Sequence, residues 1–535
     1  VGPGVSNLSA DFRIGIDVMT TETTCLSSIW ETDEKTEQYF NQHGRKDAYR
    51  CLKVNDGTYY DRCIDLDLGE VECMIALPMH PSLALPINTL KKDPKKYLKE
   101  AEDHANAQLA HKNMDLVSKV KEDGTVIVNQ GVIAGCSGGT YGNIMAASAI
   151  LNDGDCGNGE FRLSIYPDSM PVYKALVENG TVASLISTGA IFREAFCGPC
   201  FGAGDTPANN AFSIRHSTRN FPNREGSKLQ SGQIASVALM DARSIAATAA
   251  NKGFLTPATE FDGDFTKYKY FFDKKIYENR VFDSHGVADE SVEIKFGPNI
   301  KDWPAMVALT DNLLLKVVSE IHDPVTTTDE LIPSGETSSY RSNPLGLAEF
   351  TLSRKDPQYV GRAKEIQKAE KAVEAGECPV EAVPELQAVI DTIKTVYPDF
   401  GEKARKEKGY AGFGSTIFAV KPGDGSAREQ AASCQKVLGG WANIANEYAT
   451  KRYRSNLINW GMLPFLIPAG DLPFENLDYL FIPEIRKAVE NKQSEIQAYA
   501  VKDGALKPFS LHMDALTDDE REIILKGCLI NYYRG

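Results

Sequence analysis

A glycine-rich loop that carries a cysteine, set between an apolar stretch and a helix-like stretch, is the strongest constraint on the fold of this chain. The apolar residues Val132–Ala134 lead directly into Gly135-Cys136-Ser137-Gly138-Gly139, and the stretch Tyr141–Leu151 that follows is rich in Ala and Ile. This order places Cys136 at a strand-to-helix turn, where open α/β sheets bind their ligands. Residues 125–285 are therefore expected to alternate between strands and helices around a largely parallel sheet.

Two further cysteines stand at close spacing in Cys197-Gly198-Pro199-Cys200, after sixty intervening residues. Iron–sulfur clusters are held by cysteine thiolates, normally four of them. Three thiolates would leave one iron open, and an open metal position can bind a substrate as a Lewis acid. The alternative interpretation is that these are buried, reduced thiols, because a free cysteine behaves as a small hydrophobic residue.

Composition limits the classes of protein that remain. A chain of 535 residues is longer than a single core usually supports, so two or three domains are expected. A net charge of −15 argues against general nucleic-acid binding, although a local arginine cluster can still bind an anionic acid. The sequence contains no run of eighteen apolar residues, which argues against a membrane span. Eleven cysteines, an odd number, favour reduced thiols in the cytoplasm, with the mitochondrial matrix as the alternative.

Hydrophobic periodicity predicts several individual elements. We expect helices over Ala10–Met19, Lys91–Ala110, Tyr141–Leu151 and Lys364–Ala375, and strands over Cys63–Leu68, Thr125–Val128, Phe161–Tyr166, Leu313–Val318 and Gly412–Val420.

Two later motifs complete a recognisable set. Arg219-Asn220-Phe221-Pro222-Asn223-Arg224 follows the cysteine pair, and Gly423-Asp424-Gly425-Ser426-Ala427-Arg428-Glu429 comes much later. Together with the two cysteine motifs, and in the same order, they resemble the aconitase family of iron–sulfur hydro-lyases, which includes isopropylmalate isomerases. The resemblance runs from about Leu8 to the C-terminus.

The resemblance implies an α/β fold, with an aconitase-like iron–sulfur core of parallel-sheet α/β domains and a C-terminal swivel domain. It divides the chain into an α/β domain at 1–97, a cluster-binding α/β domain at 98–270, a linker at 271–300 and a swivel domain at 301–535. The implied cofactor is a [4Fe–4S] cluster with one open iron, and the implied substrate is a small 2-hydroxy di- or tricarboxylic acid.

The same resemblance assigns roles to individual residues. It makes Cys136, Cys197 and Cys200 the cluster ligands and Ser426 the catalytic base. Arg219, Arg224, Arg341 and Arg428 are implied to bind substrate carboxylates, since a guanidinium pairs with a carboxylate in a bidentate manner. Arg428 also supplies positive charge to the serine loop, Glu22 is implied to lie near the cluster, and Asp329 to orient that loop.

Several residues depart from the family pattern. Ala427 replaces a second serine, Glu330 stands at a histidine position, and Thr218 and Val18 each replace an asparagine. Ser137-Gly138-Gly139 replaces a Thr-Asn-Ser sequence after the first cysteine. Substitutions of residues that contact the substrate change which substrate an enzyme accepts more readily than they change its fold. These departures therefore argue against specificity for citrate.

The family's N-terminal domain, with its catalytic histidines, is not matched by this chain. We expect the chain to be a fragment of a longer polypeptide, or one half of a split enzyme whose other half is its partner, and to have little activity alone. Asp283-Ser284-His285 spells a tripeptide of that domain in a different context and is expected to be a surface turn. The alternatives to the hydratase are an alkylmalate- or isopropylmalate-type hydratase and a non-catalytic, iron-sensing or RNA-binding relative.

Overall fold

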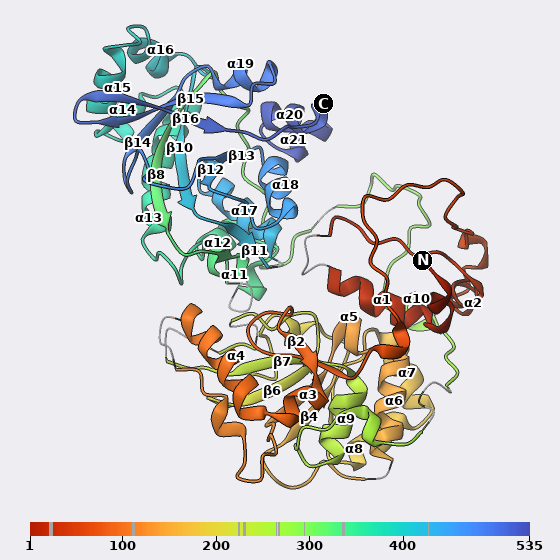
Figure 1. Cartoon of the computed structure of the whole chain (residues 1–535). Helices are drawn as coiled ribbons and strands as arrows, with labels where there is room; N and C mark the ends of the chain where they lie inside the picture. The colour runs from red at the N-terminus through yellow and green to blue at the C-terminus, as the bar shows by residue number, and fades with distance from the viewer. Residues whose placement is uncertain are drawn as a thin grey trace. The chain divides into compact units, whose positions relative to one another are not determined.

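The computed structural model describes residues 1–534 apart from 21–24, 110–112, 153, 223–224, 228–231, 264, 266–267, 294, 334–336 and 426. The chain divides into two compact units, Val1–Glu293 (unit 1) and Ile294–Gly535 (unit 2). Figure 1 labels most of the helices and many of the strands of both units.

Unit 1 is built on a seven-stranded sheet with the order β2-β1-β7-β6-β3-β4-β5. The five strands from β7 to β5 in this order are mutually parallel, and β1 joins β7 in the antiparallel direction. The strands are β1 (Met74–Ala76), β2 (Ala84–Pro86), β3 (Gln130–Ile133), β4 (Arg162–Ile165), β5 (Ile191–Phe192), β6 (Phe212–His216) and β7 (Ser236–Met240).

The helices of unit 1 begin at side chains that accept hydrogen bonds from the first turn. In α1, the Ser9 hydroxyl accepts from the Phe12 N–H, and in α6 the Thr140 hydroxyl accepts from the Asn143 N–H. The α-helices are α1 (Ala10–Met19), α2 (Glu34–Gln42), α3 (Ile87–Lys92), α4 (Pro94–Gln108), α5 (Gly135–Gly138), α6 (Tyr141–Leu151), α7 (Met170–Glu178), α8 (Thr181–Ser187), α9 (Ala242–Ala250) and α10 (Lys275–Glu278); a 3₁₀ turn, η6, spans Gly198–Cys200.

The core of unit 1 lies between the sheet and the helices that connect its parallel strands. Ile133, Leu163, Ile165, Phe212 and Ile214 are fully buried strand residues within one large apolar cluster. Strands β3 and β6 are buried along nearly their whole length, and their buried polar side chains Gln130, Ser213 and Arg215 hydrogen-bond to one another.

Unit 2 is a closed barrel with the strand order β10-β12-β13-β16-β15-β14-β8. Strands β8, β10, β12 and β13 are parallel neighbours, and the remaining pairings, including β14 with β8, are antiparallel. The strands are β8 (Asn312–Ile321), β10 (Ala411–Ala419), β12 (Gly440–Ala445), β13 (Leu463–Leu466), β14 (Tyr479–Ile482), β15 (Glu495–Lys502) and β16 (Ala505–His512), with a separate pair, β9 (Thr326–Thr327) and β11 (Pro422–Asp424).

Parallel strands require crossover connections, and the helices of unit 2 supply them. One apolar cluster fills the barrel, and two others lie between its strands and the surrounding helices. The helices are α11 (Thr328–Leu331), α12 (Pro344–Ala348), α13 (Tyr359–Glu374), α14 (Pro379–Ala382), α15 (Leu386–Lys394), α16 (Phe400–Lys406), α17 (Arg428–Val437), α18 (Lys451–Asn459), α19 (Ile485–Glu490), α20 (Asp518–Lys526) and α21 (Leu529–Arg534).

The predicted fold class is confirmed: a mixed α/β unit with a parallel sheet is followed by a unit that forms a small barrel. The strand predicted over Cys63–Leu68 is wrong. Ile64 is 92% exposed, none of the strands in the described part of the chain pairs with this stretch, and the Asp67 carboxylate accepts from the Gly69 N–H to begin a turn instead. The stretch Thr125–Val128 contributes only isolated bridges. Among the described residues, none of the helices combines the length and the apolar character that crossing a bilayer requires.

Candidate functional site

The carboxyl ends of the five parallel strands of unit 1 lie along one edge of the sheet, and every chemically distinctive loop of this unit starts there. The Cys136 loop follows β3, Asp168 follows β4, and the Cys197–Cys200 turn follows β5. The loop with Arg219 follows β6, and Asp241 follows β7. The chain places β4 and β5 on one side of β3 and then returns to place β6 on the other, so the order reverses beside β3. A ligand site is expected at such a reversal.

The glycines around Cys136 are required by close backbone packing. A Cβ on Gly138 would lie 2.4 Å from the His216 carbonyl oxygen, and one on Gly139 would lie 2.1 Å from the Tyr166 carbonyl oxygen. Gly135 adopts φ of +67°, which favours glycine. These residues therefore let the loop sit directly against the ends of β6 and β4 and present the Cys136 side chain at the surface.

The second cysteine loop is a 3₁₀ turn in which the Cys200 N–H donates to the Cys197 carbonyl over 3.1 Å. A Cβ on Gly198 would lie 2.1 Å from the Ala203 carbonyl oxygen, so this glycine is also fixed by its neighbours. Cys197 is exposed, whereas Cys200 is buried at 4% exposure. A Cβ on Gly135 would lie 3.7 Å from the Cys200 sulfur, which brings the turn against the Cys136 loop.

The three thiols lie close enough to influence one another's ionisation. Burial raises the pKa of Cys136, and a negative charge on Cys197 raises it further. A hydrogen bond with Cys197, and then burial, raise the pKa of Cys200, and Cys136 adds to this effect. Arg219, which is half-buried, opposes these shifts at both Cys136 and Cys200. The positively charged guanidinium of Arg219 therefore lies near this group of sulfurs.

A buried arginine that sequence reasoning missed anchors the second cysteine turn. Arg215, at 1% exposure in β6, donates to the Pro199 carbonyl oxygen at 2.8 Å and to the Asp205 carbonyl oxygen at 2.9 Å. It also donates to the Gln130 side-chain oxygen at 3.2 Å and to the Ser213 hydroxyl at 3.1 Å. A single arginine within an apolar strand gives no pattern in the sequence, so only the structure shows that it fixes Pro199 between the two cysteines.

Cys136 opens onto a hollow of about 310 Å³ that is walled by aromatic and acidic side chains. Desolvation by these walls raises the pKa of Asp168 to about 6, although part of its side chain reaches solvent, and the negative charge of Asp11 adds to the shift. The His43 ring packs against Tyr270 and Phe272 at centroid separations of 5.8 and 5.0 Å. Neither Asp168 nor His43 belongs to a motif, so spacing in the sequence did not reveal them.

In unit 2, the predicted serine loop runs beside the segment that carries Asp329. Strands β9 and β11 pair Thr326 with Pro422 and Thr327 with Asp424. The Thr328 hydroxyl accepts from the Ala427 N–H at 3.2 Å, and Asp329 forms a buried ion pair of 2.6 Å with Arg354. Arg428 is buried at the first position of α17. The structure thus brings the segment of Asp329 and the loop of Arg428 together.

The remaining predicted residues are not gathered in the described part of the chain. Glu22, Arg224 and Ser426 lie outside the described residues. Arg341 follows a 3₁₀ turn in unit 2, and its side chain is exposed. The functional roles of all these residues stay predictions. The Asp283-Ser284-His285 tripeptide lies in an exposed turn, where the His285 N–H donates to the Asp283 carboxylate.

The donor set in unit 1 suits an iron–sulfur cluster better than a single ion. Among the described residues, no three His, Cys, Asp or Glu side chains already form a site for one metal ion. A cluster makes a different demand, because it is held by cysteine thiolates and spreads its irons over several of them. Cys136, Cys197 and Cys200 come from two loops fixed at one sheet edge, with Arg219 beside them, and therefore fit the ligand set of such a cluster.

Comparison with known protein families gives two matches. The aconitase family (aconitate hydratase) matches residues 1–247, and the aconitase C-terminal domain matches residues 379–470, together more than half of the chain.

Individual proteins of known name are similar to parts of this chain. The 3-isopropylmalate dehydratase large subunit of Lachnoclostridium phytofermentans is 27% identical over 233 residues, covering 42% of this chain and 46% of the relative. That of Clostridium kluyveri is 26% identical over 245 residues, covering 46% and 50%. The chain thus spans about half the length of the curated relatives it matches. A solved 3-isopropylmalate dehydratase from Methanocaldococcus jannaschii matches at 19% identity with a TM-score of 0.27, covering 42% of this chain and 93% of that one.

Proposed function

The chain belongs to the aconitase family, and on that premise we propose that it carries the cluster-binding core and swivel domain of a hydro-lyase. The proposed reaction is the reversible removal of water from a small 2-hydroxy acid that bears two or three carboxylates. The proposed cofactor is a [4Fe–4S] cluster held by Cys136, Cys197 and Cys200.

The observation that carries this proposal is the meeting of three cysteine thiols from two separate loops at the carboxyl edge of a parallel sheet. The Cys200 sulfur lies 3.7 Å from the position of a Cβ on Gly135, the residue before Cys136, and Cys197 begins the turn that contains Cys200. Reduced packing residues in unrelated parts of a core have no reason to converge with a half-buried arginine beside them. The convergence supports a metal-binding role over the alternative of inert buried thiols.

Dehydration next to a carboxylate requires loss of a carbon-bound proton, stabilisation of a negatively charged intermediate and departure of hydroxide. When bound, a cluster with an open iron supplies Lewis-acid assistance to the departing hydroxyl. The chain's own residues do the rest: Arg219 would bind a substrate carboxylate through its planar guanidinium, because this geometry allows two parallel hydrogen bonds. Arg224, Arg341 and Arg428 are proposed to do the same by their match to the family motifs.

The proposed base is Ser426, whose oxygen would take the proton from carbon. A serine needs positive charge and N–H donors nearby before its oxygen can accept a proton. The residues around it fit that demand, since Arg428 is buried at the N-terminus of α17, where the helix dipole favours negative charge. The Asp329–Arg354 ion pair and the Thr328 hydroxyl would hold this loop in one conformation. Glu22 is proposed to act near the cluster.

For the substrate, the relatives favour an isopropylmalate-type acid. The matched proteins are named 3-isopropylmalate dehydratases, and Ala427 lacks the hydroxyl that a tricarboxylate would use. We therefore propose an alkylmalate-type dianion over citrate as the substrate, because fewer hydrogen-bond donors for carboxylate oxygens remain in the motif.

The cluster proposal is tested by anaerobic reconstitution with iron and sulfide. We expect the wild-type chain to bind about four iron atoms per chain and to become EPR-active on reduction. The variants C136S, C197S and C200S should each lose most of this iron. C51S is the matched control, because Cys51 is exposed like Cys136 but belongs to no motif. Equal iron content in C51S and the three motif variants, or no iron in the wild type, would refute the proposal.

The substrate proposal has a readout that does not depend on turnover. In the reduced, reconstituted protein, 3-isopropylmalate should change the EPR spectrum more than citrate does at equal concentration. R219M should suppress the change, because it removes the guanidinium beside the thiols. A larger change with citrate would contradict the alkylmalate assignment and leave the cluster assignment untouched.

A further inference from the structure

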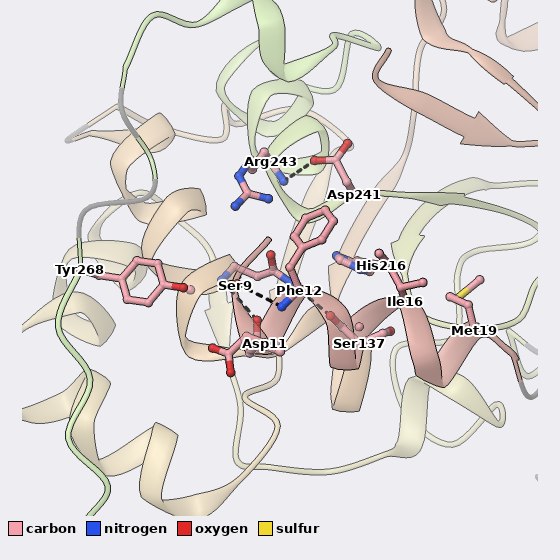
Figure 2. A pocket seen from close by; sticks show the side chains of 14 residues that line it. Ser9, Asp11, Phe12, Ile16, Met19, Ser137, His216, Asp241, Arg243 and Tyr268 are labelled. Atoms are coloured by element: carbon pink, nitrogen blue, oxygen red, sulfur yellow. Dashed lines mark hydrogen bonds between the residues drawn. The ribbon is translucent and has the colours of Figure 1, made fainter. Parts of the chain in front are cut away.

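A second cavity, of about 190 Å³, lies in unit 1 between α1 and the loops at the carboxyl edge of the sheet. Figure 2 shows its walls: Phe12, Ile16 and Met19 come from α1. His216 lies at the end of β6, Asp241 follows β7, and Arg243 lies in the first turn of α9. Ser137 closes one end and Tyr268 the other. Ligands of open α/β sheets bind at this edge, so the position itself suits a binding site.

The cavity contains polar groups that have no hydrogen-bond partner among the described residues. Ser137 is 1% exposed, and its hydroxyl makes no hydrogen bond among the described residues. Arg243 is half-buried, and within the described part of the chain its guanidinium forms neither a hydrogen bond nor an ion pair. A buried hydroxyl and a partly buried guanidinium each lose free energy when they stay unpaired. Both are donors, and a carboxylate would satisfy both.

A carboxylate, that of Asp11, also lines the cavity that Arg243 lines. No hydrogen bond or ion pair of the Asp11 side chain exists within the residues that the structure describes. Asp241, in contrast, already accepts from the Arg243 and Ser244 N–H groups as the cap of α9. One guanidinium and one carboxylate thus face the same space without reaching each other. A ligand that bridges them must itself carry both charges.

The apolar wall formed by α1 indicates that the uncharged part of the ligand is apolar. Phe12, Ile16 and Met19 recur at helical spacing along α1 and present apolar side chains to the cavity. The volume is below the 300 to 1,000 Å³ that drug-sized ligands occupy, roughly speaking, so only a small molecule fits. A carboxylate, an ammonium group and a short aliphatic chain on one carbon satisfy all three walls.

We infer that this cavity binds a small α-amino acid with a short aliphatic side chain. Its carboxylate pairs with Arg243 and Ser137, its ammonium group pairs with Asp11, and its side chain lies on α1. None of the residues assigned to the substrate or to the cluster lines this cavity, although Asp11 also lines the hollow onto which Cys136 opens, so the two spaces share one wall residue. Ser137 directly follows Cys136, and the occupant therefore contacts the loop that presents this cysteine.

Three related small molecules test the inference on the metal-free full chain by equilibrium dialysis or calorimetry. These are 2-aminobutyrate, butyrate, which lacks the ammonium group, and propylamine, which lacks the carboxylate. We expect saturable binding of 2-aminobutyrate, and about 10-fold or weaker binding of each of the others, because each loses one charged hydrogen-bonded pair. Since the assay needs no iron, it is independent of the hydratase proposal.

Variants locate the site. R243M should weaken 2-aminobutyrate binding by about 10- to 100-fold, and D11N and S137A should weaken it by smaller factors. R280M is the control, because Arg280 is an exposed arginine of the same unit that lines no cavity described above. R243K retains the charge and guards against misfolding; its binding should fall between those of the wild type and R243M. Absence of saturable 2-aminobutyrate binding at roughly 50 mM, equal binding of butyrate, or full binding by R243M would overturn the inference.

Discussion

Arg215 offers the sharpest test of how the second cysteine turn is held. In R215M the side chain remains long and apolar, but all four hydrogen bonds of the guanidinium are lost. Two of the acceptors keep another donor, since Ser213 still donates to Gln130 and Gln130 still donates to the Asp205 carbonyl. The Pro199 carbonyl and the Ser213 hydroxyl lose the donor that Arg215 supplied, and of these two only Pro199 belongs to the cysteine turn.

The magnitude follows from burial and charge. Burial lowers the pKa of Arg215, and the negative charges of Glu225 and Asp205 oppose this shift, so the guanidinium offsets two buried carboxylates. Removing one member of such a charge group costs about 3 to 5 kcal/mol of unfolding free energy. For a unit of this size, that corresponds to a fall in melting temperature of about 10 °C.

The assay combines calorimetry with mass-spectrometric measurement of alkylation at Cys200. Freed from Arg215, the turn should open more often, and the buried Cys200 should react faster than in the wild type. R280M, at an exposed arginine of the same unit, should change neither quantity. A fall below about 2 °C together with unchanged Cys200 alkylation in R215M would refute the reasoning that this arginine anchors the turn.

Two further changes test charge and packing. Burial raises the pKa of Glu370 from 4.5 to about 7, so the folded chain holds this proton more tightly and stability falls as pH rises between these values. E370Q keeps an acceptor for the Phe413 N–H and should remove up to about 3 kcal/mol of the loss of stability with rising pH. The measurement is the melting temperature as a function of pH. A pH profile equal to that of the wild type would contradict the prediction. G138A should lower the free energy of unfolding by about 1 to 3 kcal/mol, because its Cβ would meet the His216 carbonyl oxygen at 2.4 Å. G159A is the control, since its Cβ would lie in open space. Equal stability of the two variants in urea unfolding would contradict this prediction.

The sequence predicted the elements whose pattern is local. The helices at Ala10–Met19 and Tyr141–Leu151 have the predicted bounds. Each begins directly after a capping side chain, and the second is rich in Ala and Ile and buried on most sides. The family and the fold class are confirmed as well. The strand at Cys63–Leu68 was wrong because alternation alone cannot supply the neighbouring strand that pairing requires. The division of the chain at 97, 270 and 300 stays a prediction.

The candidate site divides in the same way. The cysteine loops and Arg219 carry motifs and were named from the sequence, although their roles are still predictions. Arg215 and Asp168 were not, because their positions depend on which strand lies beside which. The glycines of the Cys136 loop have a role that their sequence pattern does not reveal. In the structure they give space to the backbone of neighbouring strands, at least at Gly138 and Gly139.

The parallel strands of the unit 2 barrel should tolerate fewer substitutions than its antiparallel hairpin, β15 and β16. All nine residues of β10 are buried, since the parallel half of the barrel has side chains packed on both of its faces. Along β15, exposed and buried residues alternate over the first four positions, and β16 has a single buried residue, so much of this hairpin faces water. Random mutagenesis of this unit should therefore recover tolerated substitutions mainly in the antiparallel hairpin, while the parallel wall stays nearly invariant.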